Sequence, residues 1–357
     1  MPRPIRATIS AAALAHNLTV AKRHAGDAKV WAVLKANAYG HGVERAARAL
    51  AAADGFAVLD FSEALRLRAI GVRKPILMLE GFFKPDDLAL VAKHSLTPVL
   101  HNPGQLEILK HSALAAEIDV YLKVNSGMNR LGFGAEGLRP AYNAARMHAQ
   151  VRNITLMTHF ADADGAGGVK AQLDWFDELA RPFEVQGRSL ANSAAILRFP
   201  EARGDWVRPG IMLYGCSPFA ERSAESLGLK PVMTLTSEII ATQHLQPGER
   251  VGYAFSYEAV GEMTIGIVAC GYADGYPRHA PTGTPVLVNG KRARIVGRVS
   301  MDMISVDISA LPDADIGSPV TLWGEGLSAD EVGAAAGTLS YELLTKVTGR
   351  VPVTEAP

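Results

Sequence analysis

The chain is poor in cysteine and has no excess of charge of either sign. Its 357 residues include only two cysteines, Cys216 and Cys270, which are too few for a disulfide framework or a cysteine-rich metal site. Lysine and arginine together number 36, as do aspartate and glutamate, so the net charge is zero. A basic surplus typical of nucleic-acid binding is therefore missing. We expect neither a metal nor a nucleic-acid partner.

Long hydrophobic runs are also missing. No apolar run approaches the ~18 residues needed to span a bilayer, so no membrane segment is expected. His16 and Asn17 interrupt the alanine-rich stretch after Arg6, so the start of the chain does not resemble a secretory signal. Hydrophobic residues nevertheless make up 48% of the chain, which is enough for a large buried core. These features predict a cytoplasmic, globular enzyme.

Short apolar segments alternate with helical patterns between residues 28 and 210. Ser62, followed by Glu63, predicts a helix N-cap, and Pro85 opens another helix. Continuous apolar runs are typical of parallel strands buried on both faces, and eight such βα units favour a closed barrel. The expected strands are Val30–Leu34, Gly55–Leu59, Pro75–Leu79, Thr97–Leu100, Ile118–Val124, Ile154–His159, Ser189–Ala191 and Trp206–Val207.

The pattern changes after about residue 228, where strands are separated by turn signals. Asn289-Gly290 predicts a two-residue hairpin, and Ser328 and Glu331 have capping-box spacing before a helix. The expected fold class is α/β, with a TIM-like (β/α)8 barrel in residues 1–227 and a mostly antiparallel β domain in residues 228–357. The strands expected in the second domain are Thr234–Thr242, Met263–Ala269, Pro285–Val288, Lys291–Val296, Met303–Ile308 and Pro319–Trp323.

Lys35 ends the first expected strand, within the segment VLKANAYGHG that begins at Val33. Active sites of such barrels lie at the C-terminal ends of the strands. Apolar neighbours at positions 33 and 34 should partly desolvate the amine, which lowers a lysine pKa and favours Schiff-base formation. On position alone, a solvated lysine at a strand end is the commoner outcome.

The run KANAYGHG is similar to the pyridoxal-phosphate attachment signature of the alanine racemases, a fold-type III family, and the resemblance extends over nearly all of the chain. It implies an isomerase that interconverts L-alanine and D-alanine, with pyridoxal 5′-phosphate (PLP) bound to Lys35 as an aldimine. It also implies a homodimer with shared active sites. Both D-alanine biosynthesis and D-alanine degradation stay open as roles, and Asn125-Ser126 leans toward the degradative branch.

Two cations lie at the end of the fifth expected strand and in the loop that follows it. Arg130 lies in a glycine-rich loop, where a guanidinium suits either a substrate carboxylate or an acidic neighbour. The resemblance implies that Arg130 holds the substrate carboxylate and that Lys123, which is carbamylated in some members, steadies the arginine. His159, at the next strand end, could simply bond a backbone carbonyl. The resemblance instead places it against the cofactor ring, between Arg208 and a catalytic tyrosine.

The loops after the seventh and eighth strands are the usual phosphate site of such barrels. Asn192 and Ser193 suit a helix N-cap, and helix N-termini also bind phosphate. The resemblance assigns the cofactor phosphate to Ser193, Gly210 and Ile211, and we expect Asn192 and Tyr39 in the same set. It also places Arg208 against the pyridine nitrogen. A guanidinium cannot accept the ring's proton, so the ring is a weaker electron sink, which suits racemisation.

Four residues of the second domain complete the expected site. By themselves, Tyr253 and Tyr272 read as half-buried strand aromatics. The resemblance implies that Tyr253 of the partner subunit is a second catalytic base, opposite Lys35. It assigns Tyr272, Met301 and Asp302 to substrate binding. Near the C-terminus, Gly349 is expected where some members have a tyrosine that helps to hold the phosphate.

Three alternatives stay open. A decarboxylase with the same barrel and cofactor is disfavoured by the lysine signature and by Arg208, since such enzymes use an acidic group at that position. A non-catalytic cofactor carrier is disfavoured by the second domain. A racemase of broader specificity is disfavoured by Tyr272 and Met301, which would narrow the pocket.

Overall fold

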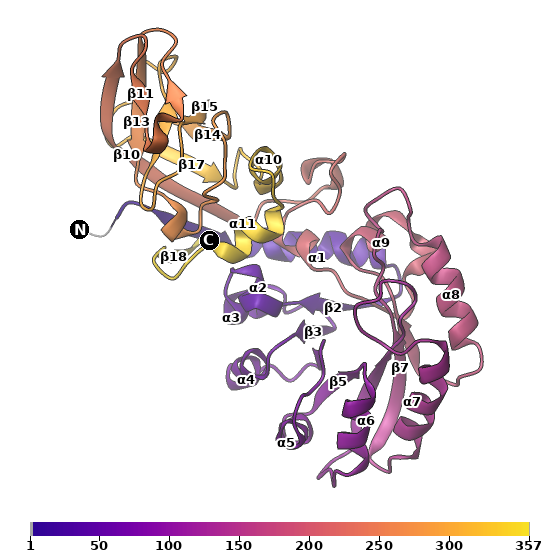
Figure 1. Ribbon diagram of the computed structural model, residues 1–357. Helices are drawn as coiled ribbons and strands as arrows, with labels where there is room; N and C mark the ends of the chain where they lie inside the picture. The colour runs from indigo at the N-terminus through magenta and orange to yellow at the C-terminus, as the bar shows by residue number, and fades with distance from the viewer. Residues whose placement is uncertain (1–2, 357) are drawn as a thin grey trace.

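The computed structural model describes residues 3–356 and consists of a barrel and a β domain (Figure 1). The barrel is closed by eight parallel strands, one for each strand expected from the sequence, and the expected fold class is confirmed. The strands are β2 (Lys29–Val33), β3 (Gly55–Val58), β4 (Ile76–Met78), β5 (Leu96–Leu100), β6 (Ile118–Lys123), β7 (Val151–Met157), β8 (Gly187–Ser189) and β9 (Trp206–Val207).

Aromatic side chains pack where the barrel closes. β2 pairs with β9, with Val30 opposite Val207. Next to that pair, the rings of Trp31 and Trp206 stack with their centroids 4.2 Å apart. The indole Nε1 of Trp31 also donates a hydrogen bond of 2.9 Å to the hydroxyl of Tyr121 across the interior. The interior of the barrel is therefore a packed core and not a pore.

The barrel helices begin with local capping signals. α4 begins at Phe61, and its N-cap is Asp60, whose carboxylate accepts from the N–H of Ser62 at 2.6 Å. The prediction that Ser62 is the N-cap is therefore wrong, because the extended backbone that a cap requires occurs at Asp60. The helices are α1 (Ala11–Ala25), α2 (Lys35–Tyr39), α3 (Val43–Ala49), α4 (Phe61–Ala69), α5 (Pro85–Lys93), α6 (Pro103–Lys110), α7 (Ala135–Met147), α8 (Lys170–Ala180) and α9 (Ser193–Arg198).

The second domain is built on an eight-stranded sheet with the order β13-β16-β15-β14-β17-β10-β1-β18. The six strands expected from the sequence are present, and most of their neighbours are antiparallel. Asn289-Gly290 forms the turn between β14 and β15, as predicted. The six strands are β10 (Met233–Leu245), β13 (Met263–Val268), β14 (Pro285–Val288), β15 (Lys291–Val296), β16 (Ile304–Asp307) and β17 (Pro319–Trp323).

The two ends of the chain also join this sheet. β1 (Arg6–Ser10) pairs antiparallel with β10 and parallel with β18 (Val353–Ala356). The first strand therefore lies outside the barrel, although the expected division assigned residues 1–227 to the barrel. In β1 the side chains of Ala7 and Ile9 are buried in the sheet. Their partners lie more than 200 residues away in sequence, so no local pattern could show this pairing.

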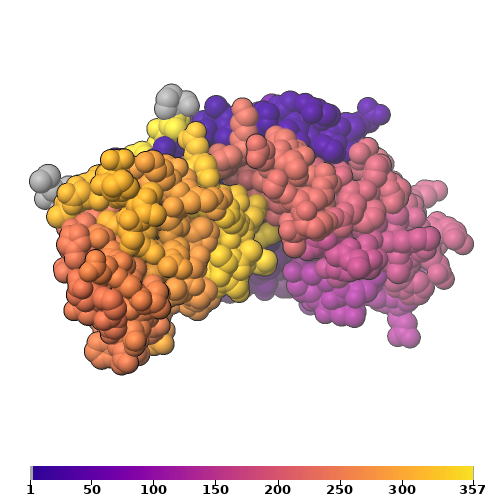
Figure 2. Space-filling model, turned by 90° about the horizontal axis from the view of Figure 1, so that it is seen from above, coloured from indigo at the N-terminus to yellow at the C-terminus, as the bar shows by residue number. Residues whose placement is uncertain are grey.

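Two short helices lie between the sheet and the barrel (Figure 1). α10 (Ala329–Ala335) starts at the expected cap, since the hydroxyl of Ser328 accepts from the N–H of Glu331. α11 (Ser340–Lys346) packs against the turn after Lys35. A Cβ on Gly40 would lie 2.2 Å from the carbonyl oxygen of Leu344, so only glycine permits this approach. Figure 2 shows this C-terminal segment between the two lobes of the molecule.

Within residues 3–356, no helix is both long and apolar enough to cross a bilayer.

A substitution at Gly55 tests the packing of the barrel interior. A Cβ at this position would lie 2.3 Å from Cζ3 of Trp31, so Gly55→Ala should overpack the core. We expect the free energy of unfolding to fall by about 1–3 kcal/mol, as measured by urea denaturation. Gly349→Ala is the control, because its Cβ would have no atom within 4 Å. A Gly55→Ala protein as stable as the unmodified chain would contradict this packing.

Candidate active site

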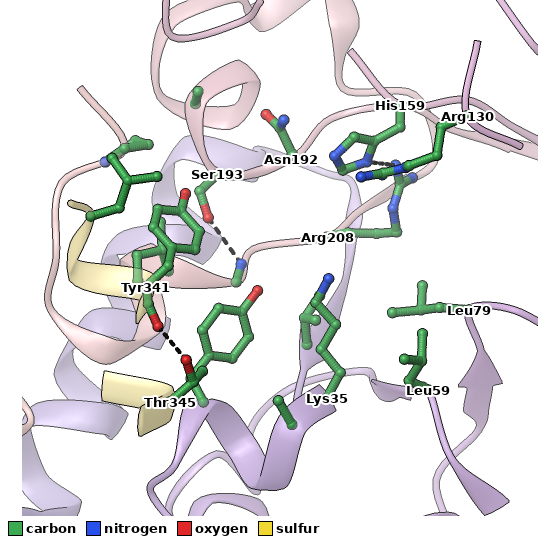
Figure 3. Close-up of a pocket in the computed structure, with 18 of the residues that line it drawn as sticks. Lys35, Leu59, Leu79, Arg130, His159, Asn192, Ser193, Arg208, Tyr341 and Thr345 are labelled. Carbon is green, nitrogen blue, oxygen red and sulfur yellow. Dashed lines mark hydrogen bonds between the residues drawn. The ribbon is translucent and has the colours of Figure 1, made fainter. Parts of the chain in front are cut away.

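A cavity of about 1000 Å³ lies at the C-terminal ends of the barrel strands. It brings together every residue that the sequence analysis placed in the barrel part of the site. Figure 3 shows several of these side chains converging from different strands. The expected residues that line the cavity are Lys35, Tyr39, Lys123, Arg130, His159, Asn192, Ser193, Arg208, Gly210 and Ile211.

The backbone after Lys35 forms a left-handed turn. The φ angles of the residues from Ala36 to Tyr39 lie between 52° and 55°, although none of these residues is glycine. Such a conformation costs roughly 1–2 kcal/mol per residue, so the surrounding structure has to hold it. Lys35 begins the turn and Tyr39 ends it, and both side chains line the cavity. The turn therefore sets the directions of two site residues at once.

Hydrogen bonds from two residues of the lysine signature help to hold this turn. The side-chain oxygen of Asn37 accepts from the N–H of Val43 at 3.1 Å. Nδ1 of His41 donates to the carbonyls of Ala38 and Tyr39, at 3.0 and 2.9 Å. Complete burial lowers the pKa of His41 to about 4, so the ring is neutral near pH 7. Asn37 and His41 thus serve the backbone rather than the cavity.

The amine of Lys35 points into the cavity beside Leu59 and Leu79 (Figure 3). Burial lowers the pKa of Lys35, and the positive charge of Arg130 lowers it further. The carboxylate of Glu80 acts in the opposite direction. A larger fraction of Lys35 is consequently neutral, and thus nucleophilic and basic, than for a lysine in water.

Arg208 is buried, and no carboxylate within residues 3–356 forms an ion pair with it. Its guanidinium donates to the carbonyls of Ser189, Thr158 and Leu190, and to the hydroxyl of Ser189. Burial lowers its pKa to about 10, so the group still carries its charge near pH 7. The carbonyl oxygens satisfy the guanidinium and fix its orientation at the wall of the cavity.

His159 is a neighbour of this arginine. Nη2 of Arg208 lies 3.4 Å from Nδ1 of His159 (Figure 3). Burial lowers the pKa of His159 well below its usual value, and the charge of Arg208 lowers it further. The neutral ring accepts from Arg208 at Nδ1, which assigns the proton to Nε2. The expected pairing of these two side chains is present.

One end of the cavity is lined by hydrogen-bond donors. The side-chain oxygen of Asn192 caps α9 by accepting from the N–H of Ala195 at 3.0 Å. The hydroxyl of Ser193 lies 2.9 Å from the N–H of Gly210. A Cβ on Gly210 would lie 2.6 Å from the hydroxyl of Tyr39, so this glycine leaves the space that the phenol uses. Burial raises the pKa of Tyr39 to about 12, which keeps its O–H a donor.

Lys123 and Arg130 line another side of the cavity. Burial lowers the pKa of Lys123 to about 8, and the charges of Arg208 and Arg130 lower it further. The loop between them is shaped by Asn125, whose side-chain oxygen accepts from the N–H groups of Gly127 and Asn129. Asn125 therefore builds the turn that presents Arg130.

The expected residues of the second domain do not line this cavity. Tyr253 is 70% exposed and Met301 is 52% exposed. The loops that carry Tyr272 and Met301 are held together, because the N–H of Tyr272 donates to the carbonyl of Ser300 at 3.0 Å. Asp302 accepts from Nη2 of Arg350 at 2.6 Å. A single chain thus keeps its two groups of expected site residues apart.

Sequence reasoning missed the contribution of α11. Tyr341 and Thr345 line the cavity from this helix, and the ring of Tyr341 lies 6.2 Å from that of Tyr39. Gly349, which is expected where some family members have a tyrosine, is not among the residues that line the cavity. The signal in the sequence for this contribution was the i, i+4 spacing of Tyr341 and Thr345, which places both side chains on one face of a helix. Glu80 was also missed, and it is the second residue after the end of β4.

The cavity thus combines a desolvated lysine, the fixed Arg208, a second arginine at position 130 and a set of neutral donors at its far end. Such a site binds an anionic molecule and places an amine beside it. The fold and this cavity define a two-domain barrel enzyme whose site centres on a lysine.

Comparisons with known proteins identify the family. The model of the alanine racemase N-terminal domain matches residues 9–218, and that of the C-terminal domain matches residues 232–355. The chain therefore belongs to the alanine racemase family. The expected domain boundary at residues 227 and 228 falls in the interval between the two matches.

Individual relatives are similar over their whole length. The alanine racemase of Ralstonia nicotianae is 54% identical, with 100% of this chain and 96% of that protein covered. The alanine racemase of Nitrosospira multiformis is 56% identical, with 98% and 99% covered. The crystal structure of biosynthetic alanine racemase from Pseudomonas aeruginosa has a TM-score of 0.97 at 48% identity, with 99% and 100% covered.

A substitution at Lys123 tests how a positive charge in the cavity affects the free energy of unfolding. Its lowered pKa means that the unfolded chain binds more protons between about pH 8 and pH 10.5. Lys123 therefore destabilises the fold fully below pH 8, and this penalty disappears as the pH rises to 10.5. We expect Lys123→Met to raise the free energy of unfolding at pH 7 by up to about 3 kcal/mol and to leave it unchanged at pH 10.5.

Chemical denaturation of the cofactor-free protein in buffer without carbon dioxide measures this effect. The control is Lys93→Met, which removes an exposed lysine of α5. A Lys123→Met gain that is the same at both pH values would show that packing, and not charge, is responsible.

Proposed function

We propose that this protein interconverts L-alanine and D-alanine with PLP bound to Lys35, and that its active site is completed by a second copy of the chain. The observation that carries the proposal is the position of the Lys35 amine. It lies between the neutral donors around Ser193 on one side and the charged Arg130 on the other. A phosphate and a carboxylate are the two anions that these sides suit.

The residues around the cavity suit PLP. Hydroxyl and amide donors would hold its phosphate, and the glycine at position 210 leaves room for them. Those residues are Tyr39, Ser193, Gly210, Ile211 and Tyr341, with Asn192 capping the helix behind them. When bound, PLP supplies an electron-withdrawing ring that acidifies the α-proton of an attached amino acid.

Arg208 makes the site better suited to racemisation than to decarboxylation or transamination. It would face the pyridine nitrogen as a permanent cation, since its pKa of about 10 keeps it protonated near pH 7. It therefore cannot take a proton from the ring. A weaker electron sink leaves negative charge at the α-carbon, where a proton has to return.

Racemisation requires proton removal from one face of the α-carbon and proton return to the other. Lys35 is the base on one face, and its lowered pKa increases the neutral fraction of the amine. Arg130 orients the substrate through its carboxylate. Two fixed bases on opposite faces avoid any need for one base to swing around the substrate.

The second base is Tyr253 of the partner subunit. Its own chain leaves this phenol exposed and outside the cavity, as it does Met301. Exposed apolar side chains of this size are typical of an interface. In the dimer, the cavity of the other barrel would be covered by Tyr272, Met301 and Asp302. These residues would limit the side chain of the substrate to a methyl group. The Nε2–H group of His159 would donate a hydrogen bond to the phenolic oxygen of the partner's Tyr253.

Lys123 is the second amine of the cavity, and we assign it to carbamylation. A lysine adds carbon dioxide only as the neutral amine, forming an N–C bond and releasing a proton. The pKa of about 8 supplies that form near neutral pH. The resulting carbamate would be an anion beside the guanidinium of Arg130 and would steady it.

Removal of the Lys35 amine tests cofactor attachment. We expect the purified protein to show a visible absorption band from bound PLP, and Lys35→Ala to lose the band. Racemase activity should fall by about 1000-fold or more, as measured by chiral analysis of the product from L-alanine. Lys123→Met removes the other lysine that lines the cavity and should keep the band. A Lys35→Ala protein with an unchanged spectrum would refute the attachment site.

Mixing two inactive variants tests whether the site is shared. A hybrid of Lys35→Ala and Tyr253→Ala chains has one site with both bases intact. Random reassociation of an equal mixture should therefore restore about one quarter of the original activity. The control mixture joins Lys35→Ala with Arg130→Ala, which leaves every hybrid site defective. Equal recovery in the two mixtures would show that Tyr253 acts in its own chain or not at all.

A further inference from the structure

We propose that Glu63 is a positioning residue for Lys35. Its carboxylate holds the left-handed turn that directs Lys35 and Tyr39 into the cavity. The inference rests on the proposed function, in which Lys35 carries the cofactor and acts as a base. Glu63 itself is not among the residues that line the cavity, so it acts through the turn.

Glu63 connects the ends of two barrel strands. It lies in the first turn of α4 and is only 7% exposed. Its Oε1 accepts from the backbone N–H of Asn37 at 2.7 Å, after β2. Its Oε2 accepts from the N–H of Leu59 at 3.3 Å, after β3. Leu59 lines the cavity beside Lys35, so one carboxylate links two of its walls.

The contact is made in the middle of the strained turn. Asn37 is one of the residues with left-handed φ, and its side chain is also held, by the N–H of Val43 and by Arg66. Arg66 in turn forms an ion pair with Glu44. Glu63 is the group that holds the backbone N–H of Asn37, which ties the turn to a neighbouring helix of the barrel.

A turn of this kind relaxes when its support is removed. Left-handed backbone is unfavourable for alanine and tyrosine, so without Glu63 the segment would sample other conformations. Lys35 and Tyr39 lie at the two ends of the turn and would both lose their directions. Glu63 therefore contributes to cofactor affinity and to the placement of the base, and not only to the stability of α4.

The test replaces the carboxylate by an amide of equal size. In Glu63→Gln one oxygen becomes an NH₂ group, so the side chain can no longer accept from the N–H groups of Asn37 and Leu59 at the same time. We expect the cofactor-free protein to bind PLP about tenfold more weakly in an absorbance titration. Amide hydrogen exchange at Asn37 should become faster in the same cofactor-free protein, which gives a measurement independent of activity.

Rescue by glycine distinguishes positioning from general stability. Glycine adopts left-handed backbone without strain, so Ala36→Gly combined with Glu63→Gln should recover most of the PLP affinity. Ala36→Gly alone is measured beside it. If Glu63→Gln does not fold, Glu63→Asp shortens the same carboxylate and should give the same weakened binding and the same rescue.

The chain offers a matched control in α5. Oδ2 of Asp87 accepts from the N–H groups of Phe83 and Lys84, at 2.9 and 3.0 Å, at the start of another barrel helix. Asp87→Asn makes the same carboxylate-to-amide change without touching the turn after Lys35. It should keep the PLP affinity of the unmodified protein.

The outcomes separate the inference from the proposed function. If the unmodified protein binds no PLP, the proposed function fails. If it binds PLP, and Glu63→Gln binds PLP and exchanges the amide of Asn37 as the unmodified protein does, the role of Glu63 is overturned while the function stands. The same holds if Asp87→Asn weakens binding equally, or if Ala36→Gly restores nothing.

Discussion

The burial of cationic groups around one cavity is the constraint on which the rest of the site depends. Lys35, Lys123, Arg130 and Arg208 line this cavity, and Glu80 is the carboxylate close enough to affect both lysines. Burial lowers the pKa of both lysines, and the positive charges of the arginines lower it further, whereas Arg208 stays charged near pH 7. The cavity therefore attracts anions and keeps an amine reactive, which are the two properties that amino-acid chemistry on a phosphorylated cofactor requires.

The fold satisfies this constraint with backbone groups. Arg208 is surrounded by the carbonyls of β7 and β8 strand ends instead of by a carboxylate, so it stays a free cation toward the cavity. His159 becomes neutral beside it and accepts its hydrogen bond. At the other end, amides and hydroxyls supply donors without adding further charge. Arg208 is thus charged and His159 neutral near pH 7.

The second domain has two separate tasks. Through α11 it adds Tyr341 and Thr345 to the cavity of its own barrel, and the close approach at Gly40 holds this helix against the lysine turn. Through the loops at Tyr253 and Met301 it presents exposed side chains that its own barrel does not use. A domain that closes one site and carries residues for another makes dimer formation part of catalysis in the proposed function.

The sequence by itself determined the eight barrel strands and six strands of the sheet, because burial on both faces and turn residues are local patterns. The family resemblance, together with the meeting of parallel strand ends at one face of a barrel, placed ten residues around one cavity. Only the tertiary structure showed β1 beside β10, Asp60 as the cap of α4 and Tyr341 at the cavity. The left-handed turn was likewise hidden, because its support comes from Glu63, which lies on another helix. These features depend on contacts between residues distant in sequence or on backbone angles, and neither leaves a periodic pattern in the sequence.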